Sequence, residues 1–276
     1  MRETSNPILR SLPQQSGGYA QFGTGMAGAA NQVTFQAPQQ TGVSRPLTID
    51  DVVTKTGITL GVLTLTAIIS YFLVGSNVAL AMPLTLIGTI GGLVMVMIAS
   101  FGRKQDNPGI VLTYAALEGL FLGAISWLFG NALVQGISAG ALITQAILGT
   151  IGVFFGMLVV YKTGAIRVTP KFTRMMVASM VGVLVLMLGS MVIGMFTHNP
   201  GGPLRDGGTM SIIFSLVVIA IAAFSFLIDF DAADQMIRAG APEKAAWGIA
   251  LGLTVTLVWL YLEILRLLSY FYSSDR

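Results

Sequence analysis

Acidic side chains lie inside long apolar runs of this chain, where a charge is costly. Glu118 lies in the middle of one run, Asp229 and Asp231 end another, and Glu263 lies within a third. Ionisable groups inside a bilayer usually face the protein interior or a water-filled path. Two carboxylates held close together in such surroundings share a proton and respond to pH, and Ca²⁺ prefers hard oxygen ligands of this kind. These residue types therefore indicate a proton-sensitive path for cations.

Spacing along a helix decides which of these side chains can act together. Asp229 and Asp231 are two residues apart, so they point to roughly opposite sides of a helix and one of them faces the bundle. Asp231 and Asp234 are three apart and share a face, which fits a solvated helix end. Glu263 and Arg266 are also three apart, so a local ion pair that only holds the helix in place is an alternative for Glu263.

The rest of the chain predicts the elements that must position these acids. Of its 276 residues, 54% are hydrophobic and only 10% are charged, whereas soluble domains carry about 25% charged residues. Runs of about 20 apolar residues span a bilayer core, and only helices cross it as single segments. The sequence predicts an all-α polytopic membrane protein with seven transmembrane helices, near residues 56–74, 79–100, 109–130, 138–161, 173–197, 209–230 and 244–271.

The first fifty residues differ from everything that follows. Residues 1–50 are rich in Gln and Gly and show little aliphatic periodicity, so they bury too little to offset the entropy of ordering. They also lack the apolar core of a signal peptide. We expect residues 1–50 to form a disordered cytoplasmic tail and residues 51–276 to form the transmembrane domain.

Basic residues predict the orientation, because seven spans place the two ends of the chain on opposite sides. Loops with many Lys and Arg residues stay in the cytoplasm. On the N-terminal side lie Arg2, Arg10, Arg45, Lys55, Arg103, Lys104, Lys162, Arg167, Lys171, Arg174, Arg238 and Lys244; the other side has only Arg205 and Arg276. The N-terminus is therefore expected in the cytoplasm and the C-terminus outside. A re-entrant last segment would instead return the C-terminus to the cytoplasm.

Several classes of function find no support in the sequence. The absence of cysteine excludes disulfides, thiolate catalysis and cysteine-based metal sites. No Walker motif, nucleotide-binding glycine fingerprint or zinc spacing occurs, and the net charge of +3 fits the orientation bias rather than nucleic-acid binding. His198, the only histidine, is expected to be an exposed loop side chain. We expect no enzyme and no cofactor, with lipid and Ca²⁺, the latter as a permeant ion, as partners.

The last two apolar runs resemble the final helices of the Bax inhibitor-1 family, in particular a bacterial branch with a long N-terminal tail. The resemblance covers residues 50–272. It rests on Ile-Asp229-Phe-Asp231, on Trp259-Leu-Tyr261-Leu-Glu263-Ile-Leu-Arg266-Leu-Leu268, on Pro83-Leu-Thr-Leu opening the second span, and on Tyr114 after a basic turn.

The resemblance implies a bundle in which the last helix is central and wrapped by the other six. It also implies a pH-sensitive Ca²⁺ leak, here in a bacterial plasma membrane. In the family an Asp at the end of the sixth helix pairs with an Asp in the seventh. Asp229 matches the first and Glu263 stands at the second, so both could contact Ca²⁺ transiently; Asp231 is a rival for the first position. Bacterial relatives carry a Glu in the second helix, where this chain has Gly88, and Glu118 either replaces that acid or has an unrelated structural role.

The distance along the last helix argues against direct contact between Asp229 and Glu263. Glu263 lies about 28 Å along a helix that begins at residue 244, at roughly 1.5 Å per residue, whereas Asp229 ends its span. The two acids approach each other if the last span begins nearer Leu251, with residues 244–250 in a cytoplasmic helix or loop, and if the sixth helix continues through Ile237. The expected pair shares one proton, so changing both acids should add little to changing one.

Two other classes of function remain open. One is a non-conducting scaffold that regulates partner membrane proteins, such as a quality-control protease, for which the tail could serve. The other is an intramembrane aspartyl enzyme, which would need two aspartates facing each other at mid-membrane. Asp229 and Asp231 lie on one helix at its cytoplasmic end, which argues against the enzyme.

Overall fold

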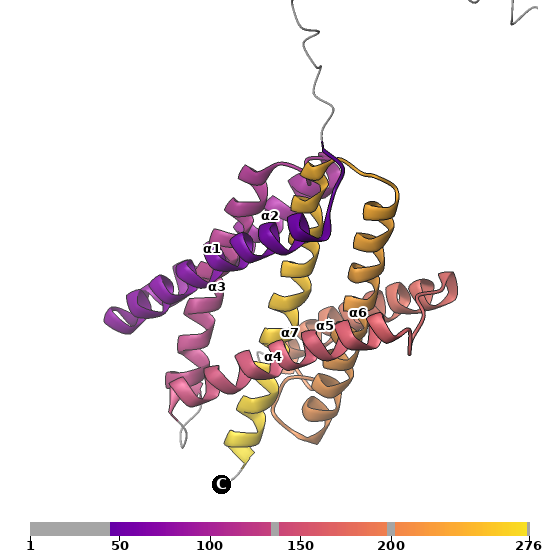
Figure 1. Cartoon of the computed structure of the whole chain (residues 1–276). Helices are drawn as coiled ribbons and strands as arrows, with labels where there is room; N and C mark the ends of the chain where they lie inside the picture. Colours follow the sequence, from indigo (N-terminus) through magenta and orange to yellow (C-terminus); the bar gives the residue numbers. More distant parts are fainter. Residues whose placement is uncertain (1–44, 134–137, 198–201, 275–276) are drawn as a thin grey trace, which may run out of the picture. The chain divides into compact units, whose positions relative to one another are not determined.

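The computed structural model describes residues 45–133, 138–197 and 202–274, and these ranges contain seven long helices (Figure 1). Each is long and apolar enough to cross a membrane, as predicted. Most of the expected tail, residues 1–44, and His198 lie outside the described residues. The long helices are α1 (Ile49–Ser76), α2 (Ala81–Phe101), α3 (Pro108–Trp127), α4 (Ala139–Thr163), α5 (Pro170–Thr197), α6 (Thr209–Arg238) and α7 (Ala246–Ser274); the short segments are η2 (Val78–Leu80), η3 (Leu128–Leu133) and η4 (Glu243–Ala245).

Two helices, α1 and α6, extend well beyond the apolar runs that predicted them. α1 begins at Ile49 rather than at residue 56, because its first two turns carry charged residues and are fixed by a cap at Thr48. α6 continues past residue 230 to Arg238. This was one of the two conditions under which Asp229 and Glu263 could approach each other. Residues 246–250, expected in a cytoplasmic helix or loop, are helical and continuous with the rest of α7.

α7 is the central helix of the bundle, as the resemblance implied. It packs against α1, α3, α4 and α6, while α2 packs against α3 and α5 packs against α6. Of its most apolar stretch 61% is buried, against at most 44% for any other of the seven described helices. A side chain on α7 therefore meets protein on several sides, and a polar side chain there must find its partner on a neighbouring helix.

Glycines bring α3 very close to α1. Gly119 and Gly123 are four residues apart and share one face of α3. A Cβ atom at Gly119 would collide with the carbonyl oxygen of Leu63, and one at Gly123 with that of Ala67. This is the small-xxx-small pattern that lets membrane helices approach backbone to backbone.

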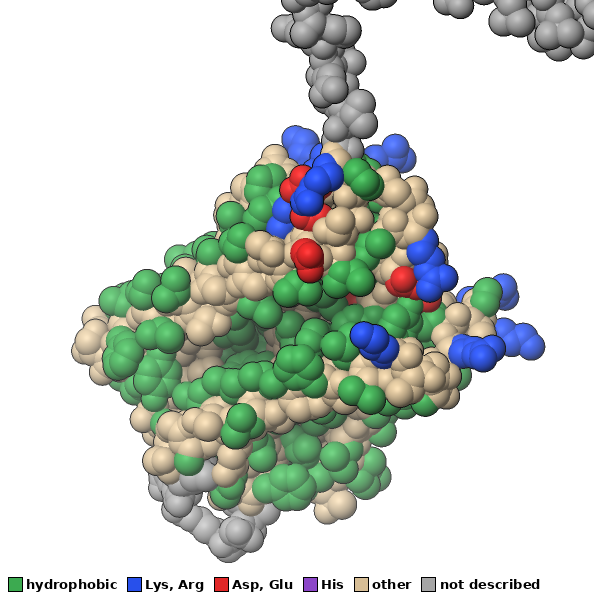
Figure 2. Space-filling model, in the orientation of Figure 1, with side chains coloured by type: hydrophobic (Ala, Val, Ile, Leu, Met, Phe, Trp, Pro, Cys, Tyr) green, Lys and Arg blue, Asp and Glu red, His purple; other side chains and the backbone are tan. Residues whose placement is uncertain are grey.

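The surface of the bundle is largely apolar, as expected of a protein surrounded by lipid. Figure 2 shows apolar side chains over most of the visible face, with Lys and Arg gathered along its upper and right-hand parts. Large apolar side chains such as Phe72 and Phe196 are 70% and 81% exposed. A protein with such an exterior would aggregate in water, so this fold requires a bilayer around it.

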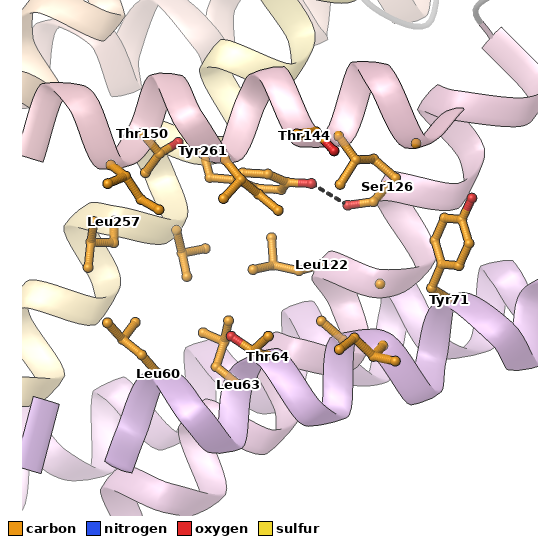
Figure 3. Close-up of a pocket in the computed structure, with 18 of the residues that line it drawn as sticks. Leu60, Leu63, Thr64, Tyr71, Leu122, Ser126, Thr144, Thr150, Leu257 and Tyr261 are labelled. Atoms are coloured by element: carbon orange, nitrogen blue, oxygen red, sulfur yellow. Dashed lines mark hydrogen bonds between the residues drawn. The ribbon is translucent and has the colours of Figure 1, made fainter. Parts of the chain in front are cut away.

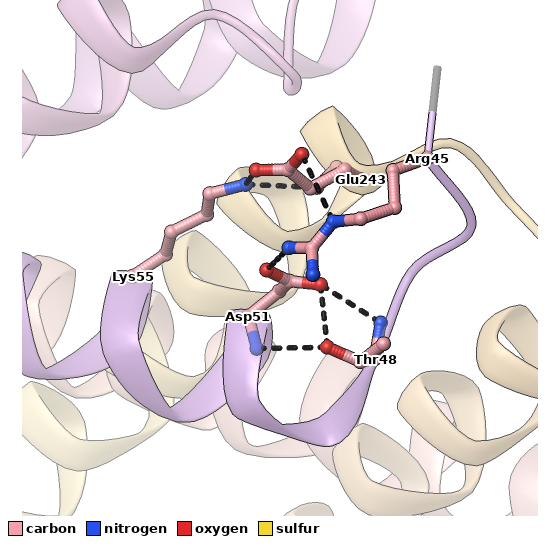
Figure 4. A network of polar contacts seen from close by, with 5 residues as sticks. All are labelled: Arg45, Thr48, Asp51, Lys55 and Glu243. Atoms are coloured by element: carbon pink, nitrogen blue, oxygen red, sulfur yellow. Dashed lines mark hydrogen bonds and ion pairs between the residues drawn. The ribbon is translucent and has the colours of Figure 1, made fainter. Parts of the chain in front are cut away.

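A group of polar contacts, here called the N-terminal clamp, fixes the start of α1 to the segment before α7 (Figure 4). Its members are Arg45, Thr48, Asp51, Lys55 and Glu243. Lys55 Nζ lies 3.1 Å from a carboxylate oxygen of Glu243, and Arg45 bridges Glu243 and Asp51 at 3.6 Å and 2.5 Å. The Thr48 hydroxyl donates to Asp51 at 2.6 Å and accepts from its backbone N–H.

Backbone contacts complete the clamp. The N–H of Leu47 donates to the carbonyl of Ala241 at 2.8 Å, and that of Glu243 donates to the carbonyl of Arg45 at 2.9 Å. The chain just before α1 and the α6–α7 connection are thus held together by both side chains and main chain.

The clamp predicts an effect of the Thr48 cap on stability. Thr48→Ala removes the hydroxyl that caps α1 and holds Asp51, so we expect it to lower the free energy of unfolding by about 1 kcal/mol, or Tm by about 2 to 4 °C. The matched control is Thr54→Ala, the same change at an exposed position within α1. Thermal unfolding of the two variants in detergent measures the difference, and equal Tm values would show that the cap contributes nothing.

The bias of basic residues predicts the orientation of the bundle. Because the chain has no cysteine, a single introduced cysteine gives an unambiguous label. Arg167→Cys, between α4 and α5, should react with a membrane-impermeant maleimide only after the cells are permeabilised, and Thr209→Cys, at the start of α6, should react in intact cells. Reaction of both from the same side would overturn the seven-span arrangement.

Candidate functional site

Asp229 of α6 faces the central helix. Its side chain is half-buried, and its Oδ2 accepts a hydrogen bond of 2.7 Å from the hydroxyl of Thr256 on α7. One turn earlier on α7, Gly252 lies beside the same carboxylate; a Cβ there would be in ordinary contact, 3.9 Å from Asp229 Oδ1. No Lys or Arg among the described residues forms an ion pair with Asp229. This acid therefore has a hydrogen-bond donor but no countercharge.

Glu263 of α7 has a different environment. Its side chain is 1% exposed. One carboxylate oxygen accepts from the hydroxyl of Ser215 on α6 at 2.8 Å, and the other lies 2.8 Å from Arg266 Nη1 and 3.7 Å from Arg205 Nη2. Arg205 belongs to the connection between α5 and α6, so Glu263 ties that connection and α6 to the central helix. The local ion pair with Arg266, one of the two alternatives drawn from spacing, is present.

The structure does not bring Asp229 and Glu263 into direct contact. Asp229 meets α7 at Thr256, two helical turns before Glu263, or about 10 Å along the axis. The register explains this separation. Asp229 lies nine residues before the end of α6 at Arg238, and Thr256 lies ten residues after the start of α7 at Ala246, so the two antiparallel helices place these positions side by side.

Sequence reasoning did not identify Thr256 and Ser215, which supply the hydroxyls at the two acids. Hydroxyl side chains in apolar helices usually bond to their own helix backbone, as Thr254 does to the carbonyl of Ala250 at 2.7 Å. Nothing in the local sequence separates Thr254 from Thr256. Only the position of α6 against α7 reveals which threonine meets an acid.

Glu118 of α3 lies against α2. A Cβ atom at Gly92 would come within 2.5 Å of Glu118 Oε2, so the absence of a side chain at Gly92 makes room for this carboxylate. Among the described residues it has no hydrogen-bond or ion-pair partner, and it is half-buried. Gly88, one turn earlier, packs so closely on α3 that a Cβ would lie 2.6 Å from that of Phe121. A Glu at position 88 would not fit, which explains why this helix carries no acid there.

Glu118 and Asp229 lie at a similar depth in the bundle. Glu118 is about 15 Å along α3 from Pro108, and Asp229 is about 14 Å from the end of α6 at Arg238; both of these ends belong to the side that the basic residues mark. Glu263 is about 25 Å from the start of α7. The two acids that lack a countercharge thus share one level, and the acid with two arginines lies toward the opposite side.

Contacts with α7 support this placement. Tyr114, one turn before Glu118, packs against Leu251 in one buried cluster, and Asp229 approaches the next residue, Gly252. Val255 lies at the same level and is 36% exposed, although it is in the middle of the central helix. α7 is therefore not fully covered by neighbouring helices at this level.

The other two acids of α6 point toward α4. Asp231 Oδ2 accepts from the amide of Gln235 at 2.6 Å, and its second oxygen lies 3.5 Å from the Tyr161 hydroxyl. Asp234 pairs with Arg238 at 2.8 Å. Asp229 and Asp231 thus contact different helices, as their spacing predicted. Within the described ranges no three His, Cys, Asp or Glu side chains are arranged to hold a metal ion.

Comparison with known proteins identifies the family. A family model described as Bax inhibitor 1 like matches residues 6–273, which is nearly the whole chain. The match begins well before residue 50, so it includes much of the segment that the resemblance was expected to leave out. No curated protein matches the chain. With its seven apolar helices, its central α7 and this match, the chain belongs to the Bax inhibitor 1 like family of membrane proteins.

Proposed function

We propose that this protein is a passive, pH-sensitive leak for cations such as Ca²⁺ in a bacterial plasma membrane, with its N-terminus in the cytoplasm. Two acids that have no countercharge among the described residues carry the proposal: Glu118, which faces α2, and Asp229, which faces α7, lie at a similar depth in the bundle. A carboxylate at the centre of a membrane helix costs about 2.5 to 3.5 kcal/mol. A passing cation or a bound proton offsets that cost.

The acids suit passage of an ion better than its storage. A conducting site must attract the ion strongly enough for entry and weakly enough for release. Glu118 approaches α2 and Asp229 approaches α7, and the described residues form no three-ligand metal site. Each carboxylate would thus contact Ca²⁺ transiently, as a stepping point rather than as part of a closed cage.

Protonation of Asp229 supplies the pH response. The ionised carboxylate can only accept hydrogen bonds, whereas the protonated acid also donates one. Because Asp229 and Thr256 join α6 to α7, a proton on Asp229 alters the contact between these helices and shifts the balance between closed and open bundles.

Glu263 has a different task in this proposal. Arg205, Arg266 and Ser215 already surround its carboxylate, so it holds the α5–α6 connection on α7 rather than sharing a proton with Asp229. Gating then depends on two separate contacts along α7. The neighbouring Asp206 does not contribute to the pH response: hydrogen bonds from the backbone of Gly208 and the hydroxyl of Ser211 hold its pKa below its usual range, so it stays charged between pH 5 and 8.

The two alternative functions, an aspartyl enzyme and a non-conducting scaffold, can each be distinguished from a leak. An aspartyl enzyme would need Asp229 and Asp231 to face each other, yet they contact α7 and α4 respectively. A scaffold would not conduct ions. Flux through the purified protein therefore separates the scaffold from the leak.

The first prediction from this proposal concerns flux. Vesicles containing the full chain and a Ca²⁺ indicator should fill with Ca²⁺ at a rate that changes between pH 5 and 8. Asp229→Asn carries a neutral amide at every pH, so most of the change of its rate with pH should be lost, with Glu118 still able to bind a proton. Asp234→Asn, an acid-to-amide change on the same helix but at the α4 side, should keep the wild-type response.

Two results would contradict the proposal. A wild-type rate equal to that of empty vesicles would exclude a leak and favour the scaffold. A normal pH response in Asp229→Asn would exclude Asp229 as the sensor, and its loss in Asp231→Asn would move the sensor by two residues.

The second prediction concerns stability. Glu263→Gln leaves two largely buried arginines without their carboxylate and should lower the free energy of unfolding by about 3 kcal/mol. Glu118→Gln is the same chemical change at an acid that has no partner among the described residues, and it should leave stability unchanged or raise it. Thermal unfolding in detergent compares the two, and equal losses would show that the arginines do not stabilise Glu263.

A further inference from the structure

A cleft between α1 and α4 lies apart from the acids and has no part in the proposed leak. Figure 2, in the orientation of Figure 1, shows the surface hollowed between these two helices. The cavity has a volume of about 540 Å³, within the range of roughly 300 to 1,000 Å³ that is usual for small-molecule sites. Residues of α1 and α4 form its walls, and residues of α3 and α7 close its inner side.

The lining of the cleft is almost wholly apolar. Among the residues that the structure describes, it contains no Asp, Glu, Lys, Arg or His. The hydroxyls of Ser126 and Tyr261 lie 2.7 Å apart and satisfy each other (Figure 3), the Thr150 hydroxyl donates to the carbonyl of Ala146, and Tyr71 accepts from Asn131 at 3.3 Å. The hydroxyls of Thr64 and Thr144 also line the cleft. The surface therefore offers mainly hydrocarbon contact, with no charged side chain among the described residues to hold a charged ligand.

The cleft is continuous with the lipid-facing exterior. Ile68 and Phe72 of α1 line it and are 49% and 70% exposed, and Ile147 and Ile151 of α4 line it and are 44% and 45% exposed. The opening therefore leads sideways into the hydrocarbon region of the bilayer. An empty apolar space there forfeits dispersion contacts that a neighbouring lipid tail can supply.

The dimensions of the cleft fit one lipid tail. Its lining extends from Leu60 to Phe72 on α1 and from Gly140 to Ile151 on α4, which correspond to about 18 Å and 16 Å of helix. An acyl chain that spans one leaflet of a bilayer core of about 30 Å is roughly 15 Å long. We propose that this cleft binds one acyl chain of a membrane phospholipid, held between α1 and α4 and in contact with Leu257, Val258 and Tyr261 of the central helix.

Photolabelling tests the proposal directly. The full chain is reconstituted into vesicles of phosphatidylcholine and phosphatidylglycerol with a trace of phosphatidylcholine that carries a diazirine in one acyl chain. After illumination, adducts are located by mass spectrometry. Residues that line the cleft should be labelled several-fold more than Leu65 and Leu148, which are exposed on the same two helices outside the lining.

A pair of matched variants shows whether the label reports occupancy. Ile143→Trp fills the cleft and should lower labelling of the remaining lining residues several-fold. Leu148→Trp adds the same ring on the lipid-facing side of α4 and should leave the labelling unchanged. If Ile143→Trp does not elute as a single species in gel filtration, Thr144→Trp, also in the lining, takes its place.

Three results would overturn the proposal. Labelling in proportion to exposure would show that lipid contacts the whole surface equally. Labelling of the lining that is unchanged by filling variants would show that no chain is held there. A lining without adducts would show that another part of this chain or a second copy fills the cleft. None of these results depends on ion flux.

Discussion

A charge within a bilayer needs either a countercharge or a route to water, and this requirement divides the acids of the bundle into two kinds. Glu263 has two arginines and a serine hydroxyl around it. Asp229 has one threonine hydroxyl, and Glu118 has no polar partner among the described residues. An acid that is fully paired contributes to holding helices together, whereas an acid without a countercharge is sensitive to protons and cations. The proposed leak rests on that difference.

The central position of α7 links the paired and the unpaired acids. The same helix receives Asp229 at Thr256 and the α5–α6 connection at Glu263, and it packs on α3 near Glu118. A change in one contact therefore acts on the helix around which the others are arranged. A glycine sets the distance at one of the acids, because Gly92 leaves space for the Glu118 carboxylate. A methyl group at Gly92 would press on the acid itself.

Much of the fold could be predicted from hydrophobicity alone. Apolar runs predicted the seven helices, because a bilayer requires about 20 apolar residues for each span. The same signal was wrong at the ends of helices, where charged turns such as Asp50 to Lys55 are helical but not apolar. Spacing correctly predicted that Asp229 and Asp231 face different ways and that Glu263 can meet Arg266.

Partners from distant parts of the chain could not be predicted. Arg205 reaches Glu263 across 58 positions of sequence, and nothing near either residue indicates that contact. The register of α6 against α7, which separates Asp229 from Glu263, depends on where both helices end, and helix ends are what hydropathy locates least well. The expected shared-proton pair followed from the resemblance, whereas the described contacts give each acid its own partners.

Independence of Asp229 and Glu263 is the central claim, and a double-mutant cycle on stability tests it most directly. The free energy of unfolding in detergent is measured for the wild type, Asp229→Asn, Glu263→Gln and the double variant. The two sites are about 10 Å apart and share no partner. The changes in unfolding free energy caused by the two substitutions should therefore add to within about 0.5 kcal/mol. A coupling energy of about 1 kcal/mol or more would show that the two carboxylates act on each other, and would contradict two separate contacts on α7.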